Sequence, residues 1–559
     1  MADDIISEPY AKGTKFTSRP DDPYNKVTIE SLSGDLQLFD GRMNHNNGWF
    51  VLRSNIKPGV TKGAVKWIIT PNVVADWMYQ PVIQTSQIGY HPTQDKEAVI
   101  EMDIRDNRKE TAQIIRIDAD GEKVVKNVTP ANWGKFLRYN YLKVNFTDVK
   151  EPGLYKIKYN TSVSPIFRID NDVYARGVWQ PVLEYFLPVQ MCHMRVNEKY
   201  RVWHDCCHMD DAQMAPAHNH IDGYDQKEGL SKFKPGEVVP GVNIGGWHDA
   251  GDFDLRIESQ AGESYILALA YEAFHPNLDV TSIDQINRVT EIHQPDGKND
   301  LLQQVENGAL TVVNGYLALG RLYRGIICND LRQYVLLGDA AAMTDGKIGN
   351  EDDRWIFTED NPGRELSTAA QLAAVSRVLK GFNDTLSVHC LDIARKVYAS
   401  TGSGNNRALF PKVQAAVELY LTTGEQPYMD FILDNQELII KQIGRIGWYT
   451  ARVEKLFAQM KNKKAKAFSA AFRKALTGYE QELNKQVQET PYGVPYRPNI
   501  WGAGWDIQRF GFQHYFLTTA YPEIFPKAPV FNASTSFSDA TRAPTRLPSP
   551  RVSAHNQPL

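Results

Sequence analysis

The sequence predicts a multidomain protein in which β-sheet domains come first and a large all-α domain follows. Short apolar segments flanked by Asn, Gly and Pro run through about the first 170 residues, as is typical of β-strands. From about Val173 onward, apolar residues recur at the three-to-four-residue spacing of amphipathic helices. The chain has 559 residues, of which 42% are hydrophobic, so it is long and apolar enough for several domain cores.

Residues 1–82 are predicted to form a β-rich segment of unknown type. Within it, Trp49–Leu52 and Lys66–Ile69 are short apolar segments with the composition of strands. One interpretation is that this segment is the remnant of a further β module.

Residues 83–171 are predicted to form a small β-sandwich. Glu97–Ile104 and Gly153–Tyr159 have strand character, and in the second of them Lys alternates with Tyr and Ile. Asp118–Gly121 lies between two apolar segments and has the composition of a turn. Short strands at this spacing are typical of a sandwich.

Residues 172–533 are predicted to be helical. Segments rich in Ala and Leu indicate on the order of ten helices, and strand patterns are nearly absent. No sequence repeat of fixed period is present, so a solenoid is not favoured. The helical segments include 265–270, 310–319, 369–375, 386–400, 407–422, 428–443, 448–460, 465–485 and 507–520.

Composition and charge exclude several classes of protein. The net charge is −4, from 62 basic and 66 acidic residues, which does not favour nucleic acid or an anionic membrane as a partner. No apolar run is long enough to span a bilayer. The opening residues, Met1–Ile6, lack the apolar core of a signal peptide. Five cysteines are too few for a disulfide framework in a chain of this length.

The segment Gly245–Phe253 carries two carboxylates three positions apart, Asp249 and Asp252. Its glycines allow a tight turn and a close approach of the backbone to a ligand. Two like charges held close together raise the pKa of one of them, which suits a base that activates water. The alternative interpretation is a turn with an Asp that caps the following helix.

A second group of residues has the ligand types of a zinc site. Cys192, the run Cys206-Cys207-His208 and His248 offer the thiolates and imidazoles that zinc prefers. Their spacing differs from that of zinc fingers, and other histidines lie nearby. The alternative is that the cysteines are buried and act as small apolar residues. The further candidate histidines are His193, His204, His218 and His220.

Two tryptophans, Trp501 and Trp505, lie four positions apart in a Gly-rich loop that follows Pro491-Tyr492. Aromatic rings in such a loop can stack on sugar rings. The alternative, at least as well founded for either Trp alone, is packing beneath the loop.

Taken together, these segments resemble glycoside hydrolase family 9, the inverting cellulases, in the subgroup with an N-terminal immunoglobulin-like module. The opening of that module is similar to Gln87–Pro92, and the signature of the catalytic domain is similar to Gly245–Asp252. The late loop of the family is similar to Pro491–Trp505, and the resemblance covers about residues 83–533. It implies an immunoglobulin-like β-sandwich followed by an α/α toroid of six helical hairpins with an open cleft at one end.

The resemblance also implies roles for single residues. Asp252 matches the catalytic base of the family, and Asp249 matches the partner that helps to hold the attacking water. No organic cofactor is implied. The aromatics expected to bind substrate are Trp247, Trp501 and Trp505. The structural zinc of the subgroup maps onto Cys192, Cys207, His208 and His248, which leaves Cys206 without a role.

Inversion requires two carboxyl groups about 6.5–9.5 Å apart, and the general acid of the family is a Glu near the end of the catalytic domain. The sequence departs from the family there. After Asn532-Ala533 comes a stretch rich in Ser, Thr, Pro and Arg, residues 534–559, with the composition of a disordered tail. The residues around Glu523 do not match those around the general acid of the family, so no residue is assigned to that role.

A shift of reading frame is the expected origin of this tail. Back-translated with ordinary codons and read two nucleotides later, residues 534–559 begin as His-Phe-Val-Leu-Gly-Cys-His-Pro-Gly-Ser, which resembles the family at this point. We therefore expect the toroid of the 559-residue chain to lack its last hairpins, and this chain to be prone to aggregation and nearly inactive.

The expected function is hydrolysis of β-1,4-glucosidic bonds in cellulose or a related β-glucan with inversion. The resemblance implies a protein that is secreted or periplasmic, and we expect a monomer. One alternative is another specificity on the same scaffold, such as xyloglucan, mixed-linkage glucan or a glucosaminide. A second alternative is a non-catalytic carbohydrate-binding protein. The missing acid favours the binder, and the intact pair of Asp249 and Asp252 favours the hydrolase.

Overall fold

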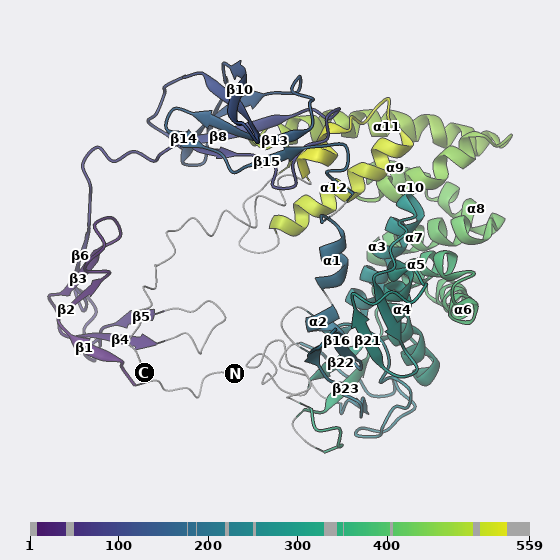
Figure 1. Ribbon diagram of the computed structural model, residues 1–559. Coiled ribbons are helices and arrows are strands. Elements are labelled where there is room, and N and C mark those ends of the chain that lie inside the picture. The colour runs from purple at the N-terminus through teal and green to yellow at the C-terminus, as the bar shows by residue number, and fades with distance from the viewer. Residues whose placement is uncertain are drawn as a thin grey trace. The chain divides into compact units, whose positions relative to one another are not determined.

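The protein, seen here as a computed structural model (Figure 1), divides into two compact units, Met1–Gln80 and Pro81–Leu559. None of the helices in the described part of the chain combines the length and the apolar character that a membrane crossing requires. The structure describes residues 8–40, 50–175, 177–185, 187–217, 223–249, 253–328, 344–349, 352–402, 406–495 and 503–533.

The first unit contains two small antiparallel sheets. Both segments expected to be strands are strands here, because Phe50–Arg53 and Trp67–Pro71 pair with neighbours. Leu36 and Phe39 on β4 are buried. The sheets have the orders β1–β4–β5 and β2–β3–β6, built from β1 (Ala11–Gly13), β2 (Lys15–Ser18), β3 (Val27–Ser31), β4 (Leu36–Asp40), β5 (Phe50–Arg53) and β6 (Trp67–Pro71).

The second unit opens with the expected β-sandwich. Its strands are β7 (Val82–Gln84), β8 (Glu97–Asp103), β9 (Ala112–Asp118), β10 (Gly121–Val128), β11 (Ala131–Phe136), β12 (Tyr139–Asn145), β13 (Gly153–Tyr159), β14 (Ser162–Val163) and β15 (Phe167–Ile169). One sheet has the order β10–β9–β13–β14, with β15 also on β13, and the other has the order β11–β12–β8–β7. Ile114 and Ile157 of the first sheet share one core with Ile100 and Leu142 of the second.

The sandwich contacts the helical part of the same unit through aromatic rings. The ring centroids of Tyr141 on β12 and Tyr492 are 6.1 Å apart, and within the helical part those of Tyr174 and Phe531 are 6.2 Å apart. The Tyr174 hydroxyl also donates a hydrogen bond of 2.7 Å to Gln94. These contacts lie at the end of the described helical domain as well as at its start.

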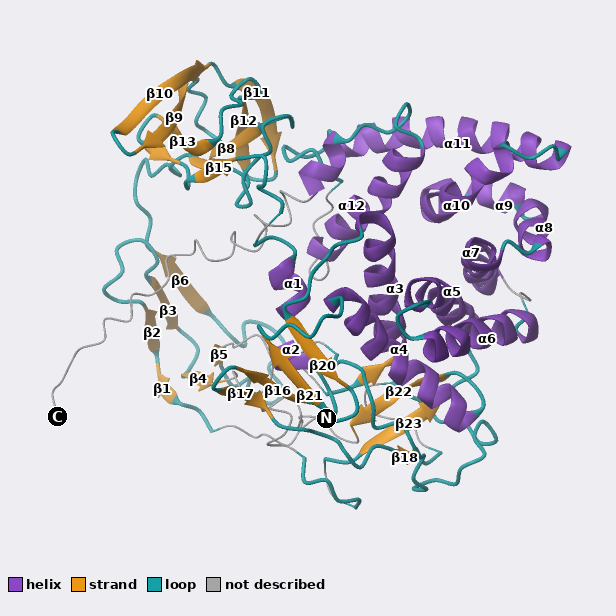
Figure 2. Ribbon diagram, turned by 45° about the vertical axis from the view of Figure 1, so that its right-hand side comes forward, coloured by secondary structure: helices purple, strands orange, loops and turns teal. Residues whose placement is uncertain are grey.

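The helical domain contains a row of packed helices, shown in purple in Figure 2. Its elements are α1 (Gln180–Tyr185), α2 (Leu187–Gln190), α3 (Ile257–Phe274), α4 (Asp300–Leu319), α5 (Pro362–Leu379), α6 (Asp384–Ser400), α7 (Asn406–Thr423), α8 (Gln426–Asp434), α9 (Gln436–Lys441), α10 (Ile443–Ala458), α11 (Lys463–Val487) and α12 (Ala503–Ala520). In the row, α3 packs on α5, α5 on α7, α7 on α10 and α10 on α12. The other long helices flank it, with α4 and α6 on α5, α8 on α7 and α11 on α10.

The expected helices are present, and two details differ from the sequence-based prediction. The segment expected as one helix over 428–443 is broken at Asn435 into α8 and α9. The expectation that strands are nearly absent from this domain is wrong, because it holds two four-stranded sheets, β17–β16–β21–β20 and β18–β23–β22–β19. Their strands are β16 (Arg195–Glu198), β17 (Arg201–His204), β18 (Gln213–Met214), β19 (Leu255–Arg256), β20 (Thr281–Asp284), β21 (Val289–Ile292), β22 (Tyr323–Cys328) and β23 (Arg354–Thr358).

A buried polar network fixes α3 within the row. The Glu418 carboxylate on α7 accepts hydrogen bonds of 2.7 Å from the Tyr265 hydroxyl on α3 and 2.8 Å from Arg377 on α5. Burial opposes ionisation of Glu418, but the charges of Arg452 and Arg377 outweigh it and lower its pKa. The network thus anchors the middle of α3, whose first turn lies beside the site described next.

Candidate active site and metal centre

Two loops far apart in the sequence are paired beside the start of α3. The Cys192 N–H donates a hydrogen bond of 3.1 Å to the Gly246 carbonyl. Gly245 permits this pairing, because its φ is +68° and a Cβ there would lie 2.3 Å from the Asn307 carbonyl oxygen. The pairing brings Cys192 next to His248.

Four buried side chains meet here at the spacing of a tetrahedral zinc site. Their ligand atoms all lie within 4.8 Å of one another. The two sulfurs are 3.7 Å apart, Cys207 Sγ is 3.7 Å from His248 Nε2, and Cys192 Sγ is 3.9 Å from His208 Nδ1. Zinc bond lengths at tetrahedral angles imply about 3.8 Å between sulfurs and about 3.6 Å between sulfur and nitrogen. The residues therefore fit the ion.

The protonation states of three of these four side chains also suit a metal, whereas the hydrogen bond with Cys192 and burial raise the pKa of the Cys207 thiol well above its usual range. Burial, followed by the charge of Arg354, lowers the pKa of His208 to about 4, and burial lowers the pKa of His248. Both imidazoles are therefore neutral at pH 7, as metal ligands must be. Burial raises the pKa of the Cys192 thiol, but the hydrogen bond from Cys207 and the charge of Arg354 bring it well below its usual range.

Arg354 is the residue at this centre that the sequence did not single out. It lies fully buried at the start of β23. Its Nη2 donates a hydrogen bond of 3.1 Å to Cys192 Sγ, and its Nε donates one of 3.1 Å to the Asp211 carboxylate. Asp211 also pairs with His193 Nε2 at 2.7 Å. No local pattern relates Arg354 to Cys192, since 162 positions separate them. The buried cation compensates thiolate charge that would otherwise be costly to bury.

Two further candidates, Cys206 and His204, are not members of the four-residue cluster. Cys206 is half-buried and its Sγ lies 3.8 Å from the Arg288 carbonyl oxygen. His204 is buried, with Nδ1 2.9 Å from the Asp205 carbonyl oxygen. His218 and His220 lie outside the described residues.

Asp249 follows His248 directly and is held from several sides. Its Oδ2 lies 3.0 Å from Arg256 Nε, and its Oδ1 accepts a hydrogen bond of 3.3 Å from the Ser259 hydroxyl on α3. Its backbone N–H donates to the Asp254 carbonyl at 2.8 Å. The carboxylate is thus fixed in orientation beside a metal ligand, which suits a group that orients a water molecule.

Glu263 is a second carboxyl group near this position. It lies one turn along α3 from Ser259 and therefore on the same face of the helix. Burial and the charge of Asp249 raise its pKa to about 7. No sequence motif points to Glu263, because only the folded chain brings it close enough to Asp249 for their charges to interact.

Of the other candidate site residues, some lie outside the described part of the chain, and the rest differ in how exposed they are. Asp252 and Trp501 lie outside the described residues. Trp505, near the start of α12, is exposed. Trp247 is 2% exposed, and its backbone N–H and carbonyl bond the Gln260 side chain at 2.9 and 2.7 Å. In this structure Trp247 has the contacts of a core residue.

Glu523, which the sequence analysis did not accept as the general acid, lies at the surface. Its carboxylate forms an ion pair with Arg473, and both side chains are about half exposed. The hydrogen bond to its own backbone and the charge of Arg473 lower its pKa. A carboxyl group with a lowered pKa does not suit the role of a proton donor.

These features define a class of protein. An immunoglobulin-like sandwich precedes a helical domain whose aspartate-bearing loop adjoins a cysteine–histidine cluster, as in modular polysaccharide hydrolases. The model of glycosyl hydrolase family 9 matches residues 183–541, and the model of the cellulase N-terminal ig-like domain matches residues 78–164. The first match covers more than half of the chain, so the chain belongs to glycosyl hydrolase family 9 and is a glycosidase by family.

Individual relatives agree with this assignment. The chain is 24% identical over 455 residues to the xyloglucan-specific endo-beta-1,4-glucanase BoGH9A of Bacteroides ovatus, covering 75% of this chain and 72% of the relative. A metagenome-derived family 9 endoglucanase has a similar fold, with a TM-score of 0.61 and 19% identity over 81% of this chain and 82% of that one. A Zn-binding triple mutant of the family 9 endoglucanase J30 gives a TM-score of 0.58 and 19% identity over 80% and 81%.

Proposed function

We propose that this chain derives from an enzyme that hydrolyses β-1,4-glucosidic bonds of a β-glucan with inversion. Asp252 is the general base that takes a proton from water as the water attacks the anomeric carbon. Asp249 orients that water. The observation that supports the proposal most is the setting of Asp249, whose carboxylate Arg256 and Ser259 hold at the start of α3.

We further propose that the cluster holds a structural zinc. Cys192, Cys207, His208 and His248 would supply all four ligands, so no position remains for substrate. Because His248 directly precedes Asp249, the ion would anchor the loop that carries the catalytic aspartates. The name of the J30 variant shows that a related fold can hold zinc.

The general acid is the part of the mechanism to which we assign none of the described residues. We propose that a Glu encoded in the shifted reading frame after Ala533 supplies this group. Family 9 cellulases are typically extracellular, and we propose a secreted or periplasmic location for the parent enzyme. A relative named for xyloglucan makes xyloglucan a substrate to test beside cellulose.

A reducing-sugar assay tests the proposal with two chains, the 559-residue chain and a chain whose reading frame is restored after Ala533. The substrates are carboxymethyl-cellulose, xyloglucan and mixed-linkage β-glucan, and a pull-down on cellulose runs beside them. We expect the restored chain to hydrolyse at least one substrate and the 559-residue chain to be nearly inactive. Binding by the restored chain without any hydrolysis would instead identify a carbohydrate-binding protein.

A further inference from the structure

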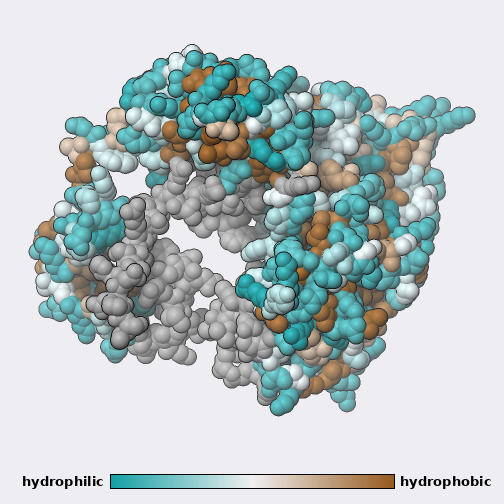
Figure 3. All heavy atoms as spheres, viewed as in Figure 1, coloured by the Kyte–Doolittle hydropathy of each residue, from teal (hydrophilic) through white to brown (hydrophobic). Residues whose placement is uncertain are grey.

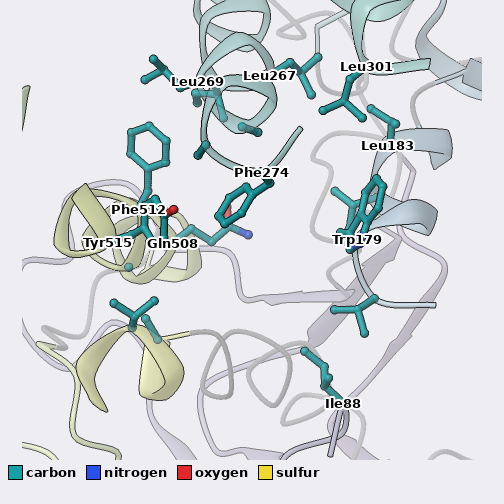
Figure 4. A pocket seen from close by; sticks show the side chains of 18 of the residues that line it. Ile88, Trp179, Leu183, Leu267, Leu269, Phe274, Leu301, Gln508, Phe512 and Tyr515 are labelled. Carbon is teal, nitrogen blue, oxygen red and sulfur yellow. The ribbon is translucent and has the colours of Figure 1, made fainter. Parts of the chain in front are cut away.

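Two cavities of the helical domain differ in the chemistry of their lining. One, of about 910 Å³ between α3 and α12, is surrounded mostly by apolar side chains such as Leu267 and Phe512 (Figure 4). Figure 3 shows that hydrophobic residues also reach the surface elsewhere on the molecule, so an apolar lining alone does not identify a ligand. The other cavity, of about 480 Å³, has charged and polar side chains in its wall, and these restrict the ligand that fits it.

This second cavity lies among the first turns of three helices of the row. Ser367 of α5, Phe410 of α7 and Arg445 of α10 line it, and each lies within the first two turns of its helix. Helix α12 adds Arg509 and Gln513 to the wall. The cavity is therefore built by four neighbouring helices of the row.

The same end of the row carries Asp249. The late turns of α3, α5 and α7 meet, because Arg377 near the end of α5 bonds Glu272 of α3 at 2.6 Å and Thr422 of α7 at 2.8 Å. These three helices therefore run in the same direction, and their first turns lie at one end of the row. Since Ser259 in the first turn of α3 holds Asp249, the cavity lies at the end where the reaction is proposed to occur.

The wall of the cavity is basic. It contains the guanidinium groups of Arg445 and Arg509, and none of the described residues that line it is acidic. Arg509 Nη2 lies 2.6 Å from Asp506 Oδ1, but both side chains are more than half exposed, and such pairs contribute little. Arg445 is exposed, and the described part of the chain places no carboxylate within ion-pair distance of it. The wall therefore has a net positive charge.

The guanidinium group of Arg445 is held against an aromatic ring. Its Cζ lies 4.7 Å from the centre of the Phe410 ring. A guanidinium that stacks on a ring keeps the N–H groups at its edge available for hydrogen bonds. These N–H groups match the two oxygens of a carboxylate, with which arginine forms paired hydrogen bonds. Arg445 therefore favours a ligand that supplies a carboxylate.

Polar side chains beside the arginines suit a sugar. Gln414 of α7 and Gln513 of α12 line the cavity, and each amide offers donors and an acceptor for hydroxyl groups. The volume of about 480 Å³ falls within the range of about 300–1,000 Å³ that is usual for ligand pockets. Gln414 also hydrogen-bonds the Tyr265 hydroxyl of α3, so the wall of the cavity is connected to the helix that holds Asp249.

We propose that this cavity binds a sugar unit that carries a carboxylate, so that the substrate is an acidic β-1,4-linked glucan instead of neutral cellulose. The carboxylate of the bound unit pairs with Arg445, and Arg509 adds to the positive potential around it. Gln414 and Gln513 bind the hydroxyl groups of the same unit. This inference rests on the proposed function, because it specifies the substrate class of the proposed glycosidase.

The experiment compares the binding of three tetrasaccharides by calorimetry. They are the β-1,4-linked tetrasaccharide of glucose, the same chain oxidised at C6 to glucuronic acid, and an α-1,4-linked tetrasaccharide of galacturonic acid with equal charge. The 559-residue chain is used, since it contains every residue of the cavity, and the frame-restored chain with Asp252→Asn is measured beside it. Low ionic strength keeps the screening of charges small. If the 559-residue chain does not remain soluble, the frame-restored chain decides.

Two variants with one positive charge fewer are compared with the parent. Arg445→Gln removes the charge inside the cavity, and Arg473→Gln removes one from α11, where the parent side chain is 53% exposed. We expect the parent to bind the acidic β-linked tetrasaccharide roughly tenfold more tightly than the neutral one, because charge-assisted hydrogen bonds are among the stronger ones. Arg445→Gln should abolish most of this preference without changing the affinity for the neutral tetrasaccharide, and Arg473→Gln should retain the preference.

Equal affinity for the neutral and the acidic β-linked tetrasaccharides would overturn this proposal and leave the proposed function intact. So would a preference that survives Arg445→Gln. Equal affinity for the two acidic tetrasaccharides would overturn it as well, since the cavity would then attract any polyanion. Binding of none of the three would also overturn it, whereas the proposed function fails only if the reducing-sugar assay shows no hydrolysis.

Discussion

Asp249 and Asp252 are three positions apart in the sequence and have different assigned tasks. Arg256 and Ser259 hold the Asp249 side chain in a fixed orientation. The proton-abstracting role is assigned to Asp252 by its match to the family motif.

Asp252→Asn, in a chain with the restored reading frame, should reduce kcat by about 10²–10⁴, as is typical when a general base is lost. The affinity for a cello-oligosaccharide should change far less, because the amide keeps the shape of the loop. Steady-state kinetics and calorimetric binding check the two parts. If Asp252→Asn keeps most of the activity and Asp249→Asn does not, the two roles are reversed.

Glu263 gives a prediction for the pH dependence of stability. Its pKa is about 7 in the folded protein and close to 4.5 in the unfolded chain, so the folded state binds the proton more tightly. The stabilisation is present below about pH 4.5 and is lost as the pH rises through 7. Glu263→Gln, which stays neutral, should therefore gain about 2–3 kcal/mol relative to the parent between pH 5 and pH 8.

Denaturant unfolding at both pH values measures this gain. Glu482→Gln, at an exposed position on α11, is the control and should give the same difference from the parent at pH 5 and pH 8. If the difference in free energy of unfolding between Glu263→Gln and the parent is also the same at pH 5 and pH 8, Glu263 is ionised in the folded protein at both pH values.

At the scale of single residues, the sequence predicted what lies in short motifs and missed what only the fold assembles. Cys192, Cys207, His208 and His248 were selected because their residue types suit zinc and the family places a site there, and the structure brings them together. Arg354 and Glu263 were not selected, because an arginine on a strand and a glutamate on a helix are usually surface residues. Their burial is a tertiary property.

At the scale of elements, the metal cluster joins the loops that carry Cys192, Cys207 and His248, and we expect one tightly bound zinc per chain. Cys207→Ser should abolish binding and lower the free energy of unfolding by several kcal/mol, because binding of a structural zinc is coupled to folding. Cys206→Ser is the matched control and should retain the metal. Elemental analysis and thermal melting with and without a chelator measure both effects. Metal-free parent protein whose melting a chelator does not change would disprove the site.

The packing of α4 on the Trp247 loop gives another prediction. A Cβ on Gly308 would lie 2.2 Å from Ser264 Oγ and 2.4 Å from the Trp247 indole. Gly308→Ala should therefore destabilise the protein by about 1–3 kcal/mol through overpacking. Gly478→Ala on α11, where a Cβ meets nothing within 4 Å, should instead stabilise it by about 0.5–1 kcal/mol through helix propensity. Equal melting shifts for the two variants would contradict this packing.

Elements were predictable from the sequence where they are long. The 25-residue α11 and the seven-residue β13 show periods that the sequence reveals directly. The strands of the two small sheets in the helical domain were missed, because runs such as Gln213–Met214 are too short to display alternation. The interruption at Asn435 was also missed, since the apolar spacing continues from α8 into α9.

At the scale of the whole molecule, the sequence predicted a sandwich followed by a helical domain, and the structure and the family match confirm it. The cavity of about 910 Å³ between α3 and α12 could not be predicted from the sequence, because it depends on which helices become neighbours.

The stereochemistry of the first product tests this account most directly. Cellohexaose is incubated with the frame-restored chain, and ¹H NMR follows the anomeric signals before mutarotation equilibrates them. Inversion of a β-linkage predicts that the α-anomer of the new reducing end appears first, and that the 559-residue chain and the Asp252→Asn variant give nearly no product. Initial release of the β-anomer, or robust hydrolysis by the 559-residue chain, would contradict the account.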